Sequence, residues 1–401
     1  MMKFTVQCVR GQGARLGKLS EMGRQGSMTL DTPMCMLYTR GGSAPFLGHD
    51  LLKRLDGVPA MVHMPVNLLA EYQETIEGYK EGMAKFAALD DKIVYTSSHD
   101  PAVEVPSGKN DKASIGVWGK GGKVRLDTDG FIKLQEAIQP DWFQCMSDAD
   151  TDKMSTKKRA IKAVDRTLIF LEDIMEKRGK SKVLQKSCVF GSLVGGYHAR
   201  QREKCVQETV AMGVDGFVIE GFHSGGAKTE EFDVEDVADL IKSTMKLLPE
   251  NCPRVMHGVW RPDRVLEAVE MGVDIFDSSY PYVLTERSHA LVFNFQYKPN
   301  PEALTEDRQN NEGFTIDLKE KRYADDFSPL LSGCTCFSCT NYTRAYMNHL
   351  FNTSELLGSI LLMLHNFHQY FGFFSTIREA LAEDRFQDLV KCVLSQIEIK
   401  P

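Results

Sequence analysis

The sequence lacks any excess of positive charge, because 55 aspartates and glutamates outnumber 48 lysines and arginines and leave a formal net charge of −7. No global positive field therefore draws the chain onto a nucleic acid, and contact with RNA would need a local patch or a partner. A hydrophobic fraction of 42% with 26% charged residues is ordinary for a globular domain with a sizeable core.

Long hydrophobic runs are also missing, since no stretch reaches the roughly 18 uninterrupted apolar residues of a membrane span. The most apolar tract, 356–374, is interrupted by polar residues that include His365 and Asn366. The first residues, MMKFTVQCVRG, do not contain the apolar core of a secretory signal. We therefore expect a cytoplasmic protein, in a reducing compartment where clustered cysteines hold metal more often than disulfides.

Apolar runs of strand length alternate with helical stretches along the chain. We expect strands at 60–66, 93–97, 142–146, 187–194, 214–222, 254–260 and 273–277. We expect helices at 157–177, 199–212, 232–248 and from Pro262 to about Gly272. Such repeats require parallel pairing with right-handed crossovers. Because no Gly-rich dinucleotide loop follows an early strand, the sequence predicts a closed α/β barrel, a (β/α)8 TIM barrel, formed by residues 1–401 as one domain.

Two stretches interrupt the alternation and are expected to be solvated connections outside the barrel. The first, 101–126, is rich in Gly, Lys and Ser and predicts strands and loops with few core positions. The second, 296–327, is polar and contains Pro299, Pro301 and a run of charges.

Three of the ten cysteines lie within six positions: Cys334, Cys336 and Cys339. A fourth ligand would complete a tetrahedron. The candidates are His365, which is separated from the last cysteine by 25 residues, His349 and His368. Four protein ligands leave no position open for water, so we expect one structural Zn²⁺ in a zinc-binding subdomain over 328–375. The alternative is a set of buried thiols beside a core histidine.

Three segments share features with one known family. They are 334–366, from CTCFSC to the pair His365-Asn366; 258–281, GVWRPDRVLEAVEMGVDIFDSSYP; and 191–196, GSLVGG. They resemble the zinc-binding region, the nucleophile-bearing strand and the substrate loop of the tRNA-guanine transglycosylase family. The resemblance covers most of the chain and implies a zinc-stabilised (β/α)8 barrel with His365 as the fourth ligand.

The resemblance also implies a process, the exchange of guanine at the wobble position of tRNAs with GUN anticodons (Asp, Asn, His, Tyr) for queuine in eukaryotes. In catalytic members of the family an aspartate attacks the ribose C1′, and a second aspartate acts as general acid/base. Asp277 matches the position of the nucleophile. Ser97 stands where the general acid/base belongs, with Asp100 three residues further on. Ser278 and Val283 replace a cysteine and an arginine of catalytic members.

The positions that bind the base in catalytic members are altered as well. Val194 replaces a glutamine, and 220–223 (EGFH) replaces a stretch of small residues. Ser147 stands in place of an aspartate that reads the base, with Asp148 next to it. A pocket without its polar groups cannot select queuine well, since each unmatched buried polar edge costs roughly 1–3 kcal/mol.

These changes predict a non-catalytic subunit, with Asp277 as a vestigial carboxylate and with His257 and His289 as packing or exposed residues. The resemblance implies a heterodimer with the catalytic queuine tRNA-ribosyltransferase subunit, which would contact tRNA in the complex. A homodimer and peripheral attachment to the mitochondrial outer membrane are further possibilities. The alternatives are an active transglycosylase that uses Asp277, and a queuine-binding carrier.

Two surface sets are candidates for these contacts. The aromatic and arginine residues Tyr342, Arg344 and Tyr346 are expected at the interface with the partner, because such residues often carry binding energy. The basic cluster Lys157, Lys158 and Arg159 is a candidate tRNA patch.

Overall fold

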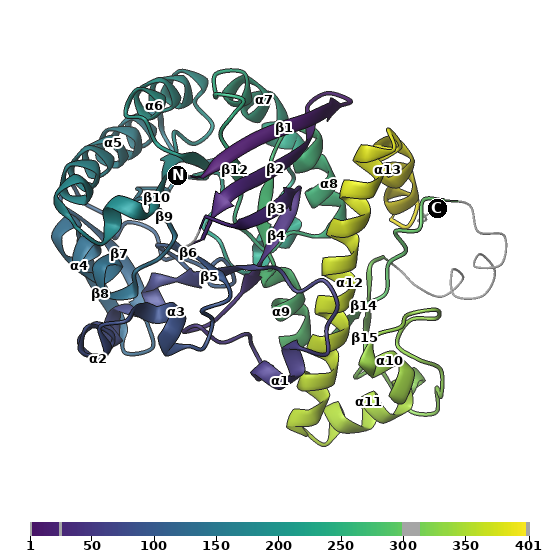
Figure 1. Cartoon of the computed structure of the whole chain (residues 1–401). Helices are drawn as coiled ribbons and strands as arrows, with labels where there is room; N and C mark the ends of the chain where they lie inside the picture. The colour runs from purple at the N-terminus through teal and green to yellow at the C-terminus, as the bar shows by residue number, and fades with distance from the viewer. Residues whose placement is uncertain (1, 24–25, 299–312, 398–401) are drawn as a thin grey trace.

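Eight parallel strands close into a barrel in chain order (Figure 1). The computed structural model describes residues 2–23, 26–298 and 313–397. The barrel strands are β4 (Met34–Tyr38), β5 (Met61–Pro65), β6 (Ile93–Ser97), β9 (Trp142–Gln144), β10 (Cys188–Leu193), β11 (Gly216–Ile219), β12 (Arg254–Val255) and β13 (Ile275–Asp277). The last strand pairs with the first, with Ile275 opposite Met34, so the sheet has no open edge. The predicted TIM barrel is confirmed.

Helices surround the strands. They are α1 (His49–Leu52), α2 (Gln73–Tyr79), α3 (Gly82–Phe86), α4 (Thr128–Ile138), α5 (Lys157–Lys180), α6 (Ala199–Ala211), α7 (Ala238–Met245), α8 (Pro262–Glu270) and α9 (Ser279–Glu286). The longest of this group, α5, starts where the Thr156 hydroxyl accepts a hydrogen bond from the Arg159 N–H. Pro262 occupies the first turn of α8. A backbone N–H there would have no acceptor within the helix, so proline removes no hydrogen bond.

One barrel strand was not predicted from the sequence, and one helix differs from its prediction. Strand β4, with the sequence MCMLY, has the all-buried pattern of an interior strand, and no alternation marks it in the sequence. The predicted helix at 232–248 is wrong in its first turns, because the chain there forms a short 3-10 turn, Glu235–Val237, before α7 begins. Buried Val234 and Val237 produce the helical spacing in the sequence without a regular helix.

A three-stranded antiparallel sheet, β1 (Lys3–Arg10), β2 (Ala14–Met22) and β3 (Met28–Thr32), precedes the barrel. Its side chains Phe4, Leu19 and Met22 share one core with interior barrel residues such as Trp142 and Phe190. This sheet therefore closes the end of the barrel at which the strands begin, and it leaves the carboxyl ends of the strands as the end available for a site.

The two inserted stretches differ in structure. In the first, β7 (Ser114–Gly119) and β8 (Gly122–Asp127) form an antiparallel pair outside the barrel, as predicted. The second is not a solvated connection throughout. Residues 299–312 lie outside the described residues, but β15 (Thr315–Asp317) pairs with β14 (His289–Leu291), and Phe314, Ile316 and Leu318 are buried. The alternation of these apolar positions was not recognised in the sequence, because the stretch as a whole is polar and charged.

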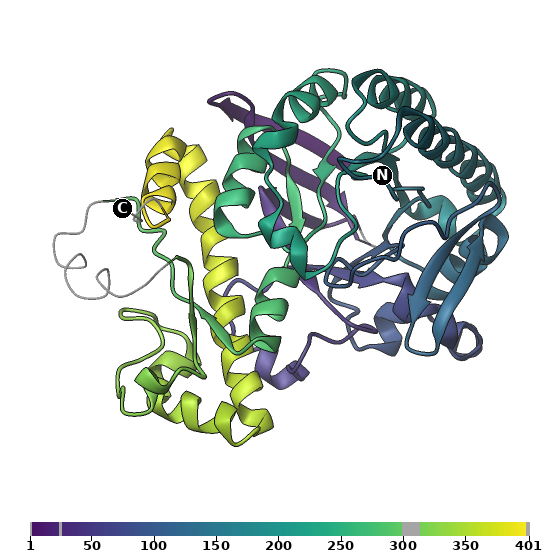
Figure 2. The same cartoon turned by 180° about the vertical axis from the view of Figure 1, so that it is seen from behind.

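The C-terminal part consists of α10 (Phe337–Asn341), α11 (Arg344–Asn352), α12 (Leu356–Ala382) and α13 (Phe386–Leu394). In Figures 1 and 2 the long helix α12 runs beside the barrel, with α10, α11, β14 and β15 packed on its other side. A separate apolar core that includes Ile316, Met347 and Leu361 joins these elements. Among the described residues, no helix is both long enough and apolar enough to cross a membrane.

Candidate metal centre and barrel mouth

Cys334, Cys336 and Cys339 meet His365 where α10 packs on α12. The His365 Nδ1 atom lies 3.3 Å from the Cys339 sulfur, 3.5 Å from that of Cys336 and 3.8 Å from that of Cys334. One ligand atom from each of the four residues lies within 4.8 Å of the others. All but Cys334, which is half-buried, are buried. This buried Cys3His cluster could hold a metal ion.

Neighbouring groups orient the four side chains. The His365 Nε2–H donates to the Leu291 carbonyl at 2.7 Å, which leaves the Nδ1 lone pair facing the sulfurs. The Gln369 amide donates to the Cys334 sulfur at 3.1 Å, and the Cys339 N–H donates to that of Cys336 at 3.4 Å. Such outer contacts are typical of metal ligands. Of the other histidine candidates, His349 is exposed and packs near Tyr346.

Without a metal, the four crowded groups shift one another's pKa values. Hydrogen bonds with Cys336 and Cys339 hold the pKa of the Cys334 thiol well below its usual value. Hydrogen bonds with Cys334 and Cys336, together with burial, raise the pKa of Cys339. Burial would lower the pKa of His365, but the adjoining sulfurs raise it to about 10. Three thiolates cannot share this space without a compensating charge, and a divalent ion would supply one.

Asp277 lies at the end of β13, at the mouth of the barrel, and is buried. Its Oδ1 accepts the Ser279 N–H at 2.9 Å, and its Oδ2 accepts the Gly258 N–H at 3.0 Å and lies 3.3 Å from His257 Nδ1. Burial opposes ionisation, but the hydrogen bond and charge of His257 outweigh it and lower the pKa of Asp277. Gly258 has φ +153°, and a Cβ there would lie 2.7 Å from the Trp260 ring, so glycine permits this close approach.

Ser97 stands at the family's general acid/base position, and Asp100 stands three residues further on. Both side chains form hydrogen bonds within the protein. The Ser97 hydroxyl lies 2.6 Å from His63 Nε2 and donates to the His99 carbonyl at 2.9 Å. Asp100 accepts the Tyr38 hydroxyl at 2.7 Å and the Ala102 N–H at 2.9 Å. Burial raises the pKa of Asp100.

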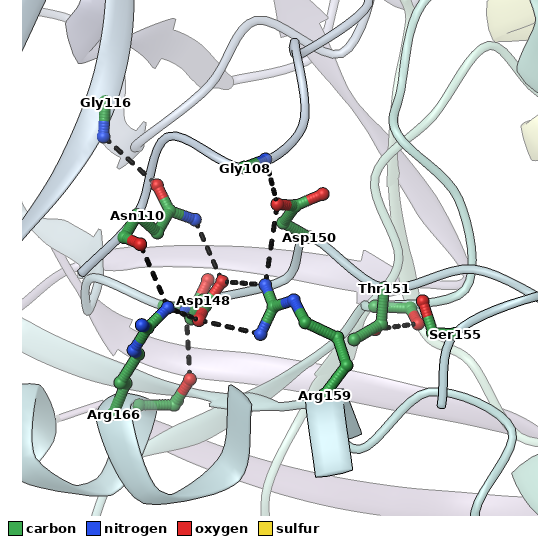
Figure 3. Close-up of polar contacts among 12 residues, drawn as sticks. Gly108, Asn110, Gly116, Asp148, Asp150, Thr151, Ser155, Arg159 and Arg166 are labelled. Carbon is green, nitrogen blue, oxygen red and sulfur yellow. Dashed lines mark hydrogen bonds and ion pairs between the residues drawn. The ribbon is translucent and has the colours of Figure 1, made fainter. Parts of the chain in front are cut away.

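Asp148 is held in a network between α5 and the insertion (Figure 3). Arg159 and Arg166 donate to its Oδ2 at 3.0 and 2.8 Å, and the Asn110 amide donates to its Oδ1 at 3.0 Å. A carboxylate with these partners has little capacity left to read a base. Arg159 also lies 3.5 Å from Asp150. The predicted basic patch is therefore reduced to Lys157 and Lys158, because Arg159 turns inward.

The remaining pocket positions are also filled from within. Glu220 accepts hydrogen bonds from the Gln144 amide at 2.8 Å and from the Ser147 hydroxyl. Val194 is buried, and the Phe222 ring lies 3.5 Å from the Arg202 guanidinium. These polar groups satisfy one another rather than facing an open pocket.

The predicted interface residues separate into two kinds. Tyr342 and Tyr346 stack with ring centroids 5.5 Å apart, and Tyr346 is 39% exposed. Arg344 is buried instead, and it donates to the Leu330 carbonyl at 3.0 Å and to Asp326 at 3.2 Å. The prediction that Arg344 lies at the interface is therefore wrong, because its side chain is hydrogen-bonded within the subdomain.

His257 was predicted to be a packing or exposed residue, and no role was predicted for His63. The structure brings both to Asp277, with one possible ligand atom from each of the three within 4.8 Å of the others. The signal for Asp277 was its place at the end of a strand, where barrel sites are built, but His63 lies in the middle of β5. Their separation of more than 200 positions concealed the contact.

Comparison with known proteins gives a consistent result. A family model described as "Queuine tRNA-ribosyltransferase" matches residues 8–398. A Xenopus tropicalis protein named "Queuine tRNA-ribosyltransferase accessory subunit 2" is 41% identical over 98% of this chain and 100% of its own length. Proteins of the same name from Homo sapiens (42% identical; 96% of this chain, 97% of that protein) and Ixodes scapularis (39%; 97% and 99%) are similar over comparable lengths.

Proposed function

The chain belongs to the queuine tRNA-ribosyltransferase family, and on this premise we propose that it is the non-catalytic subunit of a heterodimeric tRNA-guanine transglycosylase. Its catalytic partner would exchange guanine for queuine at the wobble position of tRNAs with GUN anticodons. This chain would stabilise that partner and help to position the tRNA. The protein would be cytoplasmic, and any attachment to the mitochondrial outer membrane would be peripheral.

One observation carries this proposal: the side chains at the positions on which base exchange depends are hydrogen-bonded to other residues of the protein. Ser97, at the general acid/base position, is bonded to His63 and His99, and Asp148 is bonded to two arginines. Base exchange needs a second carboxylate near the nucleophile and polar groups that face the base. Asp277 keeps the place of the nucleophile, but the neighbouring carboxyl group of Asp100 is hydrogen-bonded to Tyr38 and Ala102.

The Cys3His cluster would hold one zinc ion with a structural role. Three sulfurs and one imidazole nitrogen are the donor set of closed zinc sites, with no position left for a reacting water. Cys334, Cys336 and Cys339 on the α10 side and His365 on α12 would be the ligands. When bound, the ion would join the two helices and contribute folding free energy, on the order of 10 kcal/mol in favourable cases.

The partner would bind beside this centre. Exposed apolar side chains gather on the same part of the chain: Tyr346 (39% exposed), Leu356 (66%), Leu357 (38%) and Phe327 (77%). Apolar and aromatic residues of this kind are typical of interface cores. The stacked Tyr342 and Tyr346 would take the role first expected of Arg344.

The direct test mixes the purified chain with the catalytic subunit and measures complex mass together with labelled guanine incorporation into tRNA. We expect no incorporation by this chain alone and exchange by the mixture. Asp277→Asn in this chain should leave the activity of the mixture unchanged, while the corresponding nucleophile variant of the partner should abolish it. Incorporation by this chain alone that is lost in Asp277→Asn would instead establish an active transglycosylase.

A further inference from the structure

Two histidines and an aspartate from different strands converge at the carboxyl end of the barrel. His63 belongs to β5, His257 follows β12, and Asp277 ends β13. One nitrogen or oxygen atom from each lies within 4.8 Å of the other two. The imidazole rings are stacked, with centroids 4.7 Å apart and planes 16° from parallel.

The hydrogen bonds of His63 identify its free nitrogen. The Ser97 hydroxyl donates its proton to the His99 carbonyl at 2.9 Å, so its oxygen accepts the Nε2–H of His63 at 2.6 Å. His63 Nδ1 is therefore the nitrogen with the bare lone pair. This atom is buried and has no hydrogen-bond partner among the described residues. A buried acceptor without a partner is unfavourable unless a ligand satisfies it.

His257 and Asp277 offer the complementary atoms. His257 Nδ1 lies 3.3 Å from Asp277 Oδ2, and its Nε2 lies 2.9 Å from the Tyr95 hydroxyl. Two ligands on a tetrahedral ion with bonds of about 2.0–2.1 Å are separated by about 3.3 Å. The His257–Asp277 distance matches that edge without movement of either side chain.

We propose that His63, His257 and Asp277 form a second metal site, which takes a divalent first-row ion such as Zn²⁺ or Co²⁺. Two imidazoles and one carboxylate are the donor set of mononuclear sites that keep open positions for water. The ion binds the Nδ1 atom of each histidine and the Oδ2 atom of Asp277. Its coordination differs from that of the Cys3His cluster, which offers no oxygen ligand.

The surroundings support this assignment in two ways. Each histidine can donate its Nε2–H to a hydroxyl, that of Ser97 for His63 and that of Tyr95 for His257, which are the outer contacts that orient metal-bound imidazoles. The His257 side chain keeps 14% of its surface exposed, so water and ions have a route to the site. The metal also gives Asp277 a role that does not require nucleophilic attack.

The test uses the full-length protein with zinc already bound at the Cys3His cluster. Cobalt is titrated in, and metal content after dialysis is measured by mass spectrometry together with the visible spectrum. We expect one further equivalent of cobalt, with a weak ligand-field band and no sulfur-to-cobalt charge transfer. The His63→Gln and Asp277→Asn variants should lose that equivalent, and the exposed His49→Gln variant should keep it.

Two further measurements separate metal loss from misfolding. The variants should retain the first zinc equivalent and the wild-type circular dichroism spectrum, and added cobalt should raise the melting temperature of the wild type but not of His63→Gln. The milder Ser97→Ala variant should weaken cobalt binding by about 10-fold or more, because it removes an outer contact. The site is overturned if the wild type takes up no second equivalent, or if folded His63→Gln takes it up as well.

Discussion

Asp277 combines full burial with ionisation, and both follow from its neighbours. Two backbone N–H groups and His257 contact its oxygens, and they outweigh the cost of burying the charge. The same pattern recurs at Asp148, whose buried carboxylate is satisfied by two arginines. At the scale of residues, Asp277 and Asp148 at the barrel mouth are therefore satisfied by neighbouring donors, whereas His63 Nδ1 is left without a partner.

The lowered pKa of Asp277 predicts how stability depends on pH. Its folded pKa lies below the usual 3.8, so its contribution is fully present above that value and is lost as pH falls through the folded pKa. The difference in free energy of unfolding between wild type and Asp277→Asn should be largest near about pH 6 and should shrink toward about pH 3. Urea unfolding across this range, without added metal, measures it. A difference that does not change with pH would contradict the assignment.

At the scale of elements, one buried ion pair joins the N-terminal sheet to the barrel. Arg15 on β2 donates to Asp274, which precedes β13, through two nitrogens, one of them at 3.0 Å. Asp274 also accepts the Arg254 N–H at 2.8 Å, and Arg15 reaches the Glu250 carbonyl at 3.0 Å. The pair therefore connects three segments at the closed end of the barrel.

Arg15→Ala should destabilise the fold by about 3–5 kcal/mol, because it leaves the buried Asp274 carboxylate without its partner. The matched control is Arg125→Ala, which breaks the exposed Arg125–Asp111 pair and should cost no more than about 1 kcal/mol. Chemical denaturation of both variants and the wild type gives the comparison. Equal losses in the two variants would show that burial does not set the strength of this contact.

At the scale of the whole molecule, α12 connects the barrel to the proposed partner surface. The Tyr370 hydroxyl donates to the Trp260 carbonyl at 3.0 Å, and Arg378 donates to the Pro33 carbonyl at 2.9 Å. His365 on the same helix faces the three cysteines on its other side. The exposed apolar residues near α11 and the start of α12 are thereby held rigidly relative to the barrel, which lowers the entropic cost of binding.

The interface proposal predicts that Tyr346→Ala combined with Leu356→Asp weakens binding of the catalytic subunit by about 30-fold, or about 2 kcal/mol. Met154→Asp is the control, since Met154 is an apolar residue 88% exposed before α5. Cys336→Ser should also prevent co-purification, because loss of a metal ligand disorders the α10 region. Titration of labelled partner with each folded variant measures affinity. Full binding by the double variant would place the interface elsewhere.

The sequence by itself determined the barrel class and the three clustered cysteines, because local spacing shows both, while His365 was expected from the family resemblance. Alternating strands and helices repeat along the chain, and three of the four candidate ligands lie within six positions. Only the tertiary structure decided which polar residues remain free. Arg159 and Arg344 read as exposed cations, yet each turns inward to a carboxylate. The approach of His63 to Asp277 likewise depends on barrel closure, which brings together strands that no local pattern relates.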